Sequence, residues 1–197
     1  MAQIVLASTS AYRRRLLERI LPEFVQAAPD CDETPKPGER PDDLVRRLSI
    51  AKALSVAATH PHSLIIGSDQ IGWDGQQMLT KPGSIDAASH QLRCMAGKTL
   101  QFLSGVSIVE ANTGRTEYAC AEVSATLRTL SESEIHRYLL HDTPLDCAGS
   151  FKIESLGIAL FTSVASEDPT ALEGLPLITV SNLLRCFGVN PLTRWNP

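Results

Sequence analysis

The chain has 197 residues, of which 43% are hydrophobic and 20% charged, and it carries a formal net charge of −4 with a pI near 5.7. This composition excludes disordered and fibrous proteins and allows a well-buried core in a single domain over residues 1–197. We expect no stable binding to nucleic acid or to an anionic membrane, because both favour a basic surface. No apolar run approaches the ~20 residues of a membrane helix, and the N-terminal segment lacks the features of a signal peptide, so we expect a cytoplasmic protein.

The cysteine and histidine patterns give no sign of a structural metal site. The five cysteines are odd in number, widely spaced and without a C-x-x-C motif, which predicts reduced, mostly buried thiols and no disulfide framework. The five histidines form no H-E-x-x-H motif and lie in polar surroundings, so we expect them at the surface.

The first part of the chain predicts a strand, a helix, a loop and a second helix. Residues 3–7 are an apolar run of strand length, and residues 8–10 are hydroxyl residues that can cap a helix. Apolar residues then recur at helical spacing as far as Ile20. Residues 30–41 are rich in proline and charge, which is typical of an exposed loop, and helical periodicity returns over residues 44–60.

The next segment predicts a short strand, a hairpin and a helix. Residues 64–67 are a brief apolar run that leads into Asp69, which places Asp69 at the C-terminal end of a strand. The Asp-Gly pair at residues 74–75 is a strong hairpin signal. Ser84 is expected to precede a helix that Gly97 ends.

Two long strands follow over residues 100–109 and 117–127, joined by a hairpin at residues 112–114. Residues 131–134 have the form of a capping box, which predicts the start of a further helix. Because helices alternate with some adjacent strand pairs, the sequence predicts an α/β protein with a mixed sheet.

Two signals describe the C-terminal part of the chain. Asp168 and Pro169 predict a turn in which Asp168 is an N-cap and Pro169 occupies the first helical position. A last helix is expected from about Leu177 until Gly188.

The strand-to-helix turn near the N-terminus is a candidate phosphate site. A helix N-terminus presents free backbone N–H groups and a partial positive charge, and Ser8, Ser10 and Arg13 would add further donors. The alternative is an ordinary capped helix with a solvated basic turn.

Acidic residues supply a candidate base and candidate metal ligands. Asp69 could deprotonate a water or hold a divalent metal, although an aspartate after a strand is also a common turn former. Asp30, Asp32 and Glu33 offer the oxygen ligands that Mg²⁺ or Mn²⁺ prefers. The alternative is a solvated acidic loop.

Seven short motifs occur in order along the chain: L-A-S-x-S-x-x-R (residues 6–13), D-E (32–33), K-A (52–53), G-S-D-Q (67–70), K-P (81–82), C-A-G-S-F (147–151) and G-L-P-L (174–177). Together they resemble the Maf family of nucleotide pyrophosphatases over almost the whole chain. The resemblance implies a mixed, twisted sheet with flanking helices in two lobes, similar to inosine triphosphate pyrophosphatase, with an active-site cleft between the lobes.

The resemblance also implies hydrolysis of a nucleoside triphosphate to a monophosphate and diphosphate, a divalent cation, Mg²⁺ or Mn²⁺, and often a homodimer. Asp69 would be the proton acceptor and would hold the metal together with Glu33. The residues implied to gather phosphates are Ser8, Ser10, Arg13, Lys52 and Lys81.

Three residues predict the substrate base. Tyr12, Gln70 and Glu154 stand where the dTTP and UTP branch of the family has other residues, and they resemble the YceF-like branch, whose substrate is 7-methyl-GTP. The methylated base is positively charged, so the face of Tyr12 could attract it, and Glu154 could accept from the guanine N1–H and N2–H groups.

Two rival functions stay open at this point, namely a dTTP or UTP pyrophosphatase and a non-catalytic, nucleotide-binding regulator of cell division or septum formation. The chain also departs from the family pattern at three positions. Ala11 stands in place of a proline, while Thr80 and Ser155 each stand in place of a glycine.

Overall fold

The structure is a computed structural model that describes residues 2–195 and divides into two compact units. The first unit consists of Met1–Gln70, Leu103–Ala121 and Asp168–Pro197, and the second of Ile71–Phe102 and Glu122–Glu167. Each unit is therefore built from segments that are distant in sequence.

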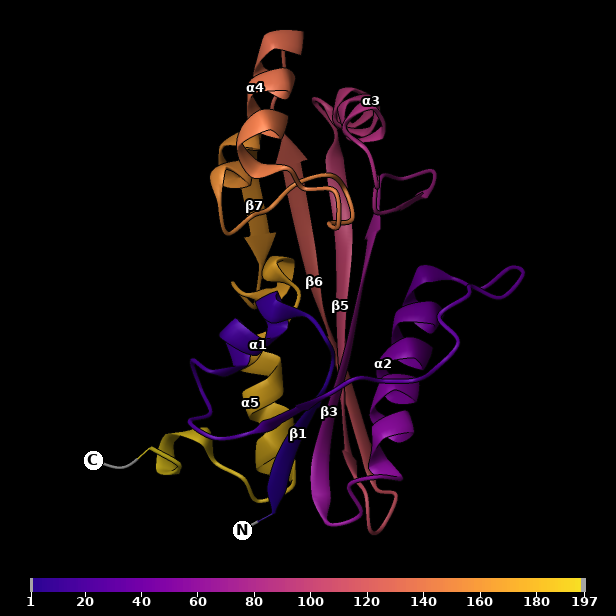
Figure 1. Cartoon of the computed structure of the whole chain (residues 1–197), viewed down its shortest axis with the longest axis vertical. Coiled ribbons are helices and arrows are strands. Elements are labelled where there is room, and N and C mark those ends of the chain that lie inside the picture. Colours follow the sequence, from indigo (N-terminus) through magenta and orange to yellow (C-terminus); the bar gives the residue numbers. More distant parts are fainter. Residues whose placement is uncertain (1, 196–197) are drawn as a thin grey trace. The chain divides into compact units, whose positions relative to one another are not determined.

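The helices and strands occur in the following order (Figure 1): β1 (Gln3–Ala7), α1 (Ala11–Leu17), β2 (Val25–Ala27), α2 (Pro41–Ala57), β3 (Ser63–Trp73), β4 (Met78–Leu79), α3 (Ile85–Met95), β5 (Thr99–Glu110), β6 (Thr116–Leu127), α4 (Glu132–Asp142), β7 (Phe161–Ser166) and α5 (Leu177–Cys186). Short 3-10 helices are η1 (Leu156–Leu160), η2 (Ala171–Glu173) and η3 (Pro191–Thr193). The strand order is β2-β1-β3-β5-β6-β7, and β4 pairs with β3. Because β1 is parallel to β2 and β3 whereas β4 and β7 pair antiparallel, the predicted mixed sheet is confirmed.

In the first unit, helices cover both faces of β1 and β3 (Figure 1). Alternate strand residues such as Leu6 and Ile66 pack with α1 and α5, and the intervening residues, such as Val5 and Ile65, pack against α2. Burial on both faces explains why these strands read as unbroken apolar runs.

Helix α2 lies unusually close to β3, and Gly67 makes this possible. A Cβ atom added at Gly67 would clash with the carbonyl oxygen of Ser49 and lie 2.8 Å from the backbone nitrogen of Ala53. The Ser107 hydroxyl donates to the same Ser49 carbonyl over 2.8 Å, which ties α2 to β5 as well. Small residues thus fix the height of α2 over the sheet.

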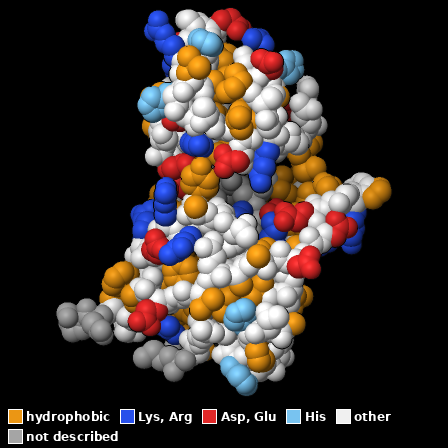
Figure 2. Space-filling view, in the orientation of Figure 1, with side chains coloured by type: hydrophobic (Ala, Val, Ile, Leu, Met, Phe, Trp, Pro, Cys, Tyr) orange, Lys and Arg blue, Asp and Glu red, His pale blue; other side chains and the backbone are white. Residues whose placement is uncertain are grey.

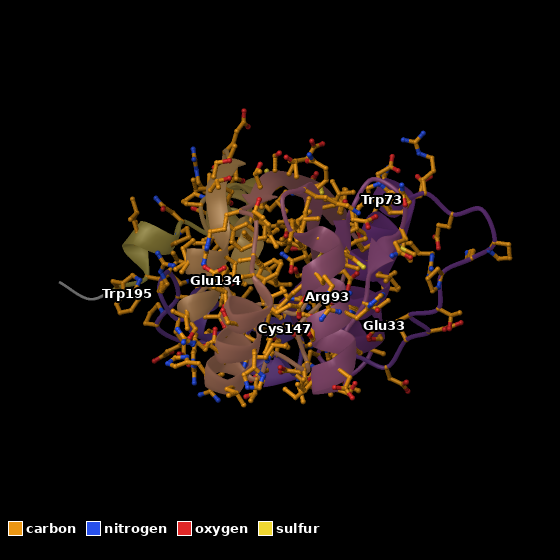
Figure 3. All side chains as sticks on the ribbon, turned by 90° about the horizontal axis from the view of Figure 1, so that it is seen from above. Glu33, Trp73, Arg93, Glu134, Cys147 and Trp195 are labelled. Carbon is orange, nitrogen blue, oxygen red and sulfur yellow. The ribbon has the colours of Figure 1, made fainter. Side chains whose placement is uncertain are left out.

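The second unit has an aromatic core and two packed helices. Phe151 contacts Phe102 and Phe161 edge to face, with ring centroids 5.7 and 4.9 Å apart. Gly72 leaves room for the Phe102 ring, since a Cβ there would come within 2.6 Å of it. Helices α3 and α4 pack together, and Arg93 of α3, labelled in Figure 3, binds Glu132 at the start of α4 over 2.6 Å.

Local signals in the sequence predicted several boundaries correctly. Ser84 caps α3, and Ser131 with Glu134, which Figure 3 labels, forms the predicted capping box of α4. The Asp-Gly turn at residues 74–75 joins β3 and β4 as an antiparallel hairpin, and the predicted turn at residues 112–114 joins β5 and β6.

Three predictions on the elements were wrong. Strand β3 continues to Trp73, so Asp69 lies inside a strand and not at its end. Helix α1 ends at Leu17, and Ile20 falls in the following turn. Pro169 does not begin a helix, because the next turn is the short 3-10 helix η2, with Thr170 at its N-cap.

The expectation of mostly buried thiols was also wrong. Cys94, Cys120 and Cys186 are exposed, whereas Cys31 and Cys147 are half-buried. Cys94 and Cys186 lie on the solvent faces of amphipathic helices, where a small side chain is tolerated without packing.

None of the helices in residues 2–195 combines the length and the apolar character that crossing a membrane requires.

Candidate active site

The first unit brings together a lysine and two carboxylates. The Nζ atom of Lys52 donates to Oδ1 of Asp69 over 2.7 Å and to Oε2 of Glu33 over 2.8 Å. Lys52 and Asp69 are 6% and 8% exposed, whereas 57% of the Glu33 side chain is accessible. The ammonium group therefore bridges a buried carboxylate to an exposed one, which is labelled in Figure 3.

The fold places these groups through the close contact between α2 and β3. Asp69 follows Gly67, which is the last β3 residue paired with β1. Beyond that point no β1 backbone lies beside β3, so the Asp69 side chain meets Lys52 of α2 instead. Although β3 is longer than predicted, Asp69 still lies where a parallel pairing ends, the position that open α/β sheets use for ligands.

The loop that carries Glu33 is held by Arg47 of α2. The Arg47 guanidinium binds the Glu39 carboxylate over 2.6 and 2.8 Å and donates to the carbonyl oxygens of Asp32 and Thr34. The hydrogen bond from Arg47 lowers the pKa of Glu39 to about 2. The loop is thus not merely a solvated acidic segment, and of its predicted acidic ligands only Glu33 reaches Lys52.

The hydroxyl groups of the predicted phosphate turn serve the turn itself in this structure. Oγ of Ser8 accepts from the backbone nitrogen of Ser10 over 3.1 Å, and Oγ of Ser10 caps α1 by accepting from the nitrogen of Arg13 over 3.3 Å. Both serines therefore shape the connection between β1 and α1, and each hydroxyl still has a proton to donate.

Arg13 connects three segments of the first unit. Its Nε atom donates to the carbonyl oxygen of Gly174 and its Nη1 atom to that of Ser68, each over 2.9 Å. Burial lowers the pKa of the Arg13 guanidinium, although the charges of Asp69 and Glu33 act in the opposite direction. The cation thus lies in the same electrostatic environment as the two carboxylates, and Nη2 has no hydrogen-bond partner among residues 2–195.

Gln70 binds the loop that precedes α5. Its Nε2 atom donates to Oγ of Ser104 over 3.0 Å and to the carbonyl oxygens of Ala171 and Leu172 over 2.8 and 3.3 Å. The buried Ser104 hydroxyl also donates to Ala171 over 2.7 Å. Sequence reasoning missed Ser104, and no local signal marks it, since a serine inside a strand carries no recognisable motif.

The remaining predicted residues are divided between the units. Tyr12 is half-buried on α1 in the first unit, and Lys81 and Glu154 are exposed in the second. Over the face of the molecule shown in Figure 2, basic and acidic side chains are interspersed.

The carboxylates of Asp69 and Glu33 suit a magnesium or manganese ion by their chemistry, because hard cations take oxygen ligands and Mg²⁺ commonly uses one or two carboxylates plus substrate phosphates. The described residues contain no group of three or more His, Cys, Asp or Glu that could hold a metal on its own. Asp69 and Glu33 would therefore supply only part of the ligand shell of such an ion.

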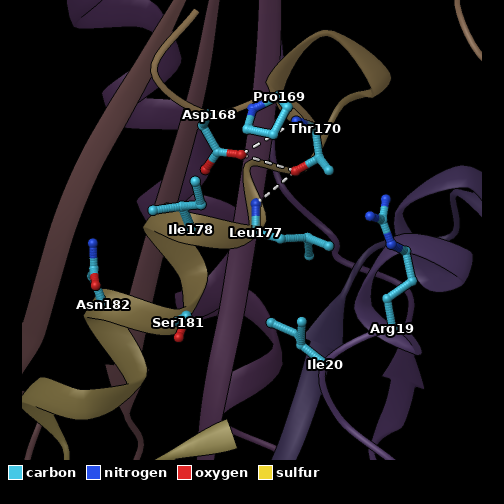
Figure 4. A pocket seen from close by; sticks show the side chains of 9 residues that line it. All are labelled: Arg19, Ile20, Asp168, Pro169, Thr170, Leu177, Ile178, Ser181 and Asn182. Atoms are coloured by element: carbon cyan, nitrogen blue, oxygen red, sulfur yellow. Dashed lines mark hydrogen bonds between the residues drawn. The ribbon is translucent and has the colours of Figure 1, made fainter. Parts of the chain in front are cut away.

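A separate pocket lies by the N-terminus of α5, and two of its polar side chains, Asp168 and Thr170, are hydrogen-bonded within the protein (Figure 4). Oδ2 of Asp168 accepts from the nitrogen of Thr179 over 2.9 Å, and Oγ1 of Thr170 accepts from the nitrogen of Leu177 over 2.8 Å. Asp168 therefore caps α5 from a distance, while its Oδ1 atom accepts from the backbone nitrogen of Thr170 in its own turn over 3.3 Å, as predicted for a local cap. None of the predicted site residues lines this pocket.

Residues 3–187 match the family model described as Maf-like protein. A Bordetella pertussis protein named 7-methyl-GTP pyrophosphatase is 47% identical over 191 residues, which cover 97% of this chain and 95% of the relative. Proteins of the same name from Aromatoleum aromaticum and Pseudomonas putida are 48% and 46% identical and cover 95% and 96% of this chain, and 97% and 98% of the relatives.

Among solved structures, the Staphylococcus aureus Ham1 protein aligns with a TM-score of 0.51 at 16% identity, over 94% of this chain and 97% of that one. This likeness concerns the fold alone. Together with the mixed sheet, it confirms the predicted fold class.

Proposed function

This chain belongs to the Maf-like protein family, and we propose from that premise that it hydrolyses 7-methyl-GTP to 7-methyl-GMP and diphosphate. The observation that supports a catalytic role is the cluster of Asp69, Lys52 and Glu33. A protein that only binds a nucleotide needs no buried carboxylate held by a lysine, since such a group adds a desolvation cost without contributing affinity for an anion.

We assign the role of general base to Asp69. Lys52 occupies Oδ1, and Oδ2 has no hydrogen-bond partner among residues 2–195, so Oδ2 is the atom that would take a proton from water. The resulting hydroxide attacks the α-phosphorus, the bond from that phosphorus to the α,β-bridging oxygen breaks, and diphosphate leaves with the bonding electrons. Lys52 and Arg13 supply positive charge close to the developing negative charge.

The proposal includes a divalent cation, Mg²⁺ or Mn²⁺, held by Asp69 and Glu33. When bound, such an ion neutralises phosphate charge and polarises the phosphoryl group. Ser8 and Ser10 would donate their hydroxyl protons to phosphate oxygens while their lone pairs keep the turn in place, and Lys81 would add a further cation.

Base recognition is assigned to Tyr12, Gln70 and Glu154. A cation–π contact between Tyr12 and the methylated base would contribute about 1–2 kcal/mol if desolvated. Glu154 would accept from the guanine N1–H and N2–H groups. Since the Gln70 Nε2 atom is bound to Ser104 and the loop before α5, Oε1 is the Gln70 atom that would contact substrate.

The test is product analysis with Mg²⁺ or Mn²⁺ and a panel of 7-methyl-GTP, GTP, dTTP, UTP and ATP. We expect monophosphate and diphosphate from 7-methyl-GTP in preference to the others, and a loss of at least about a hundredfold in kcat for Asp69→Asn, as for removal of a general base. Preference for dTTP or UTP would reassign the substrate, and nucleotide binding without cleavage would favour the regulatory alternative.

A matched pair of variants on one loop tests the metal ligand. Glu33→Gln removes the carboxylate that contacts Lys52, whereas Asp32→Asn alters a neighbour whose carboxylate is hydrogen-bonded to Thr34 of its own loop. Glu33→Gln should raise the Mn²⁺ concentration needed for half-maximal activity, and Asp32→Asn should leave it unchanged.

The proposal further includes a cytoplasmic location and a homodimer, the latter measurable by light scattering.

A further inference from the structure

The turn that carries Glu154 is attached to the C-terminal end of α4, within the second unit. At the start of the turn, the backbone nitrogen of Lys152 donates to the Tyr138 hydroxyl over 2.9 Å, and the Lys152 ammonium donates to the carbonyl oxygen of Asp142 over 3.0 Å. The nitrogen of Ser155 closes the turn by donating to the carbonyl oxygen of Lys152 over 3.2 Å. Glu154 is exposed between these two fixed points.

The end of the turn is held by the Asp142 side chain. Oγ of Ser155 donates to Oδ1 of Asp142 over 2.8 Å, and the backbone nitrogen of Gly157 donates to Oδ2 over 3.1 Å. Nδ1 of His141 lies 2.9 Å from the same Oδ1 atom. Both carboxylate oxygens of Asp142 are therefore used to hold residues that flank Glu154.

The environment of Asp142 combines burial with hydrogen bonds that favour its charged form. The residue is only 6% exposed. Burial acts to raise the pKa of the carboxyl group, but the hydrogen bonds from His141, Ser155 and Gly157 outweigh burial and hold the pKa below its ordinary value. A buried carboxylate that stays charged is a firm anchor, because its charge-assisted hydrogen bonds are stronger than neutral ones.

Backbone packing leaves the turn little freedom. A Cβ atom at Gly157 would clash with the carbonyl oxygen of Lys152 and lie 2.9 Å from the Lys152 nitrogen, so the chain after the turn passes directly against its start. The family pattern has a glycine at position 155, and a glycine has no hydroxyl group. The Ser155 hydroxyl is therefore an additional contact of this chain.

We propose that Asp142 is a positioning residue for base recognition, which acts through Ser155 and Gly157 to fix the Glu154 carboxylate in the orientation that reads the substrate base. The inference rests on the proposed function, since it takes Glu154 as the group that accepts from guanine. Two base N–H donors must meet one carboxylate side by side, and such a bidentate contact is sensitive to the angle at which the carboxylate is held.

The experiment measures, in four proteins, the ratio of kcat/KM for 7-methyl-GTP to kcat/KM for UTP. The uracil base of UTP lacks the paired N–H donors. The four proteins are the wild type, Ser155→Ala, Asp142→Asn and, as a control, Ser131→Ala, which weakens the same helix at its opposite end by removing the N-cap. We expect the ratio to fall about tenfold in Ser155→Ala and at least as far in Asp142→Asn, as when a charge-assisted hydrogen bond loses its alignment. The fall should come mainly from a higher KM for 7-methyl-GTP, and Ser131→Ala should keep the wild-type ratio.

The outcomes separate this inference from the proposed function. An unchanged ratio in Ser155→Ala and Asp142→Asn overturns the positioning role, and so does an equal fall in Ser131→Ala. If Asp142→Asn does not fold, the milder Ser155→Ala decides alone. If the wild type cleaves none of the nucleotides, the proposed function fails by itself, and the ratio of Kd values for the same two nucleotides then carries the test of Asp142.

Discussion

Lys52 is a buried lysine whose ammonium group has two carboxylate partners, Asp69 at 2.7 Å and Glu33 at 2.8 Å. Removing charges from water costs free energy that their mutual attraction only partly restores, so a buried ion pair contributes little net stability. Loss of one partner is much more costly, because the other charge then stays buried and unpaired. The cluster therefore fits the proposed chemistry at Asp69 better than a role in stability.

Replacement of Lys52 tests how costly the loss of one partner of this ion pair is. Lys52→Met should lower the free energy of unfolding at pH 7 by about 3 kcal/mol, since it leaves the Asp69 carboxylate buried without its cation. Adding Asp69→Asn to the same protein should restore part of the loss. Urea denaturation of the two single variants and the double variant measures the coupling, and additive losses would show that the two side chains do not interact.

At the scale of elements, the contact of α2 with β3 sets the position of the cluster. Gly67 permits the contact, and the Arg47 side chain extends its effect to the loop that carries Glu33. A change in the height of α2 over the sheet would therefore move Lys52, and with it the loop of Glu33, relative to Asp69.

Gly67→Ala is expected to lower the free energy of unfolding by about 1–3 kcal/mol, as overpacking does, and to reduce kcat because Lys52 shifts with α2. Gly114→Ala is the control, since Gly114 has a φ of 74° in an open turn of the same unit, and a methyl group there meets nothing within 4 Å. It should strain the backbone and leave kcat unchanged. Equal kcat values in the two variants would show that the packing of α2 against β3 does not affect catalysis.

How well the elements and the site could be predicted depended on how far apart in sequence the interacting residues lie. Ser84 and Ser131 cap helices through bonds to residues three positions away, and such signals can be read locally. The bond from Arg13 to Gly174 joins residues 161 positions apart, and that from Gln70 to Ala171 spans 101, so no local pattern announces either. Asp168 shows both ranges, because its local bond to Thr170 was predictable whereas its bond to Thr179 on the next α-helix was not.

At the scale of the whole molecule, the two units share strands. The chain passes from one unit to the other after Gln70, Phe102, Ala121 and Glu167. The first three of these points lie inside β3, β5 and β6. Neither unit is therefore a continuous piece of chain. Unfolding one unit would break the hydrogen-bonded pairing of strands that continue into the other.

We accordingly expect both units to unfold in one transition. The chain has two tryptophans, Trp73 in the second unit and Trp195 in the first, where its indole donates to the carbonyl oxygen of Ile20 over 3.2 Å (Figure 3). Fluorescence of Trp195→Phe and Trp73→Phe variants reports on the second and first units, and their denaturation midpoints should each coincide with the circular-dichroism midpoint of the same variant. A tryptophan signal that changes at a different midpoint would show independent unfolding.

The exposed thiols, which were predicted to be buried, provide natural attachment points for spectroscopic probes. Cys94 lies in the second unit and Cys186 in the first, and both are accessible on helices. With the other three cysteines replaced, a pair of spin labels at these two positions would give the distribution of distances between the units in solution. Recording it with and without nucleotide would measure any domain closure directly, without adding a single new cysteine to the chain.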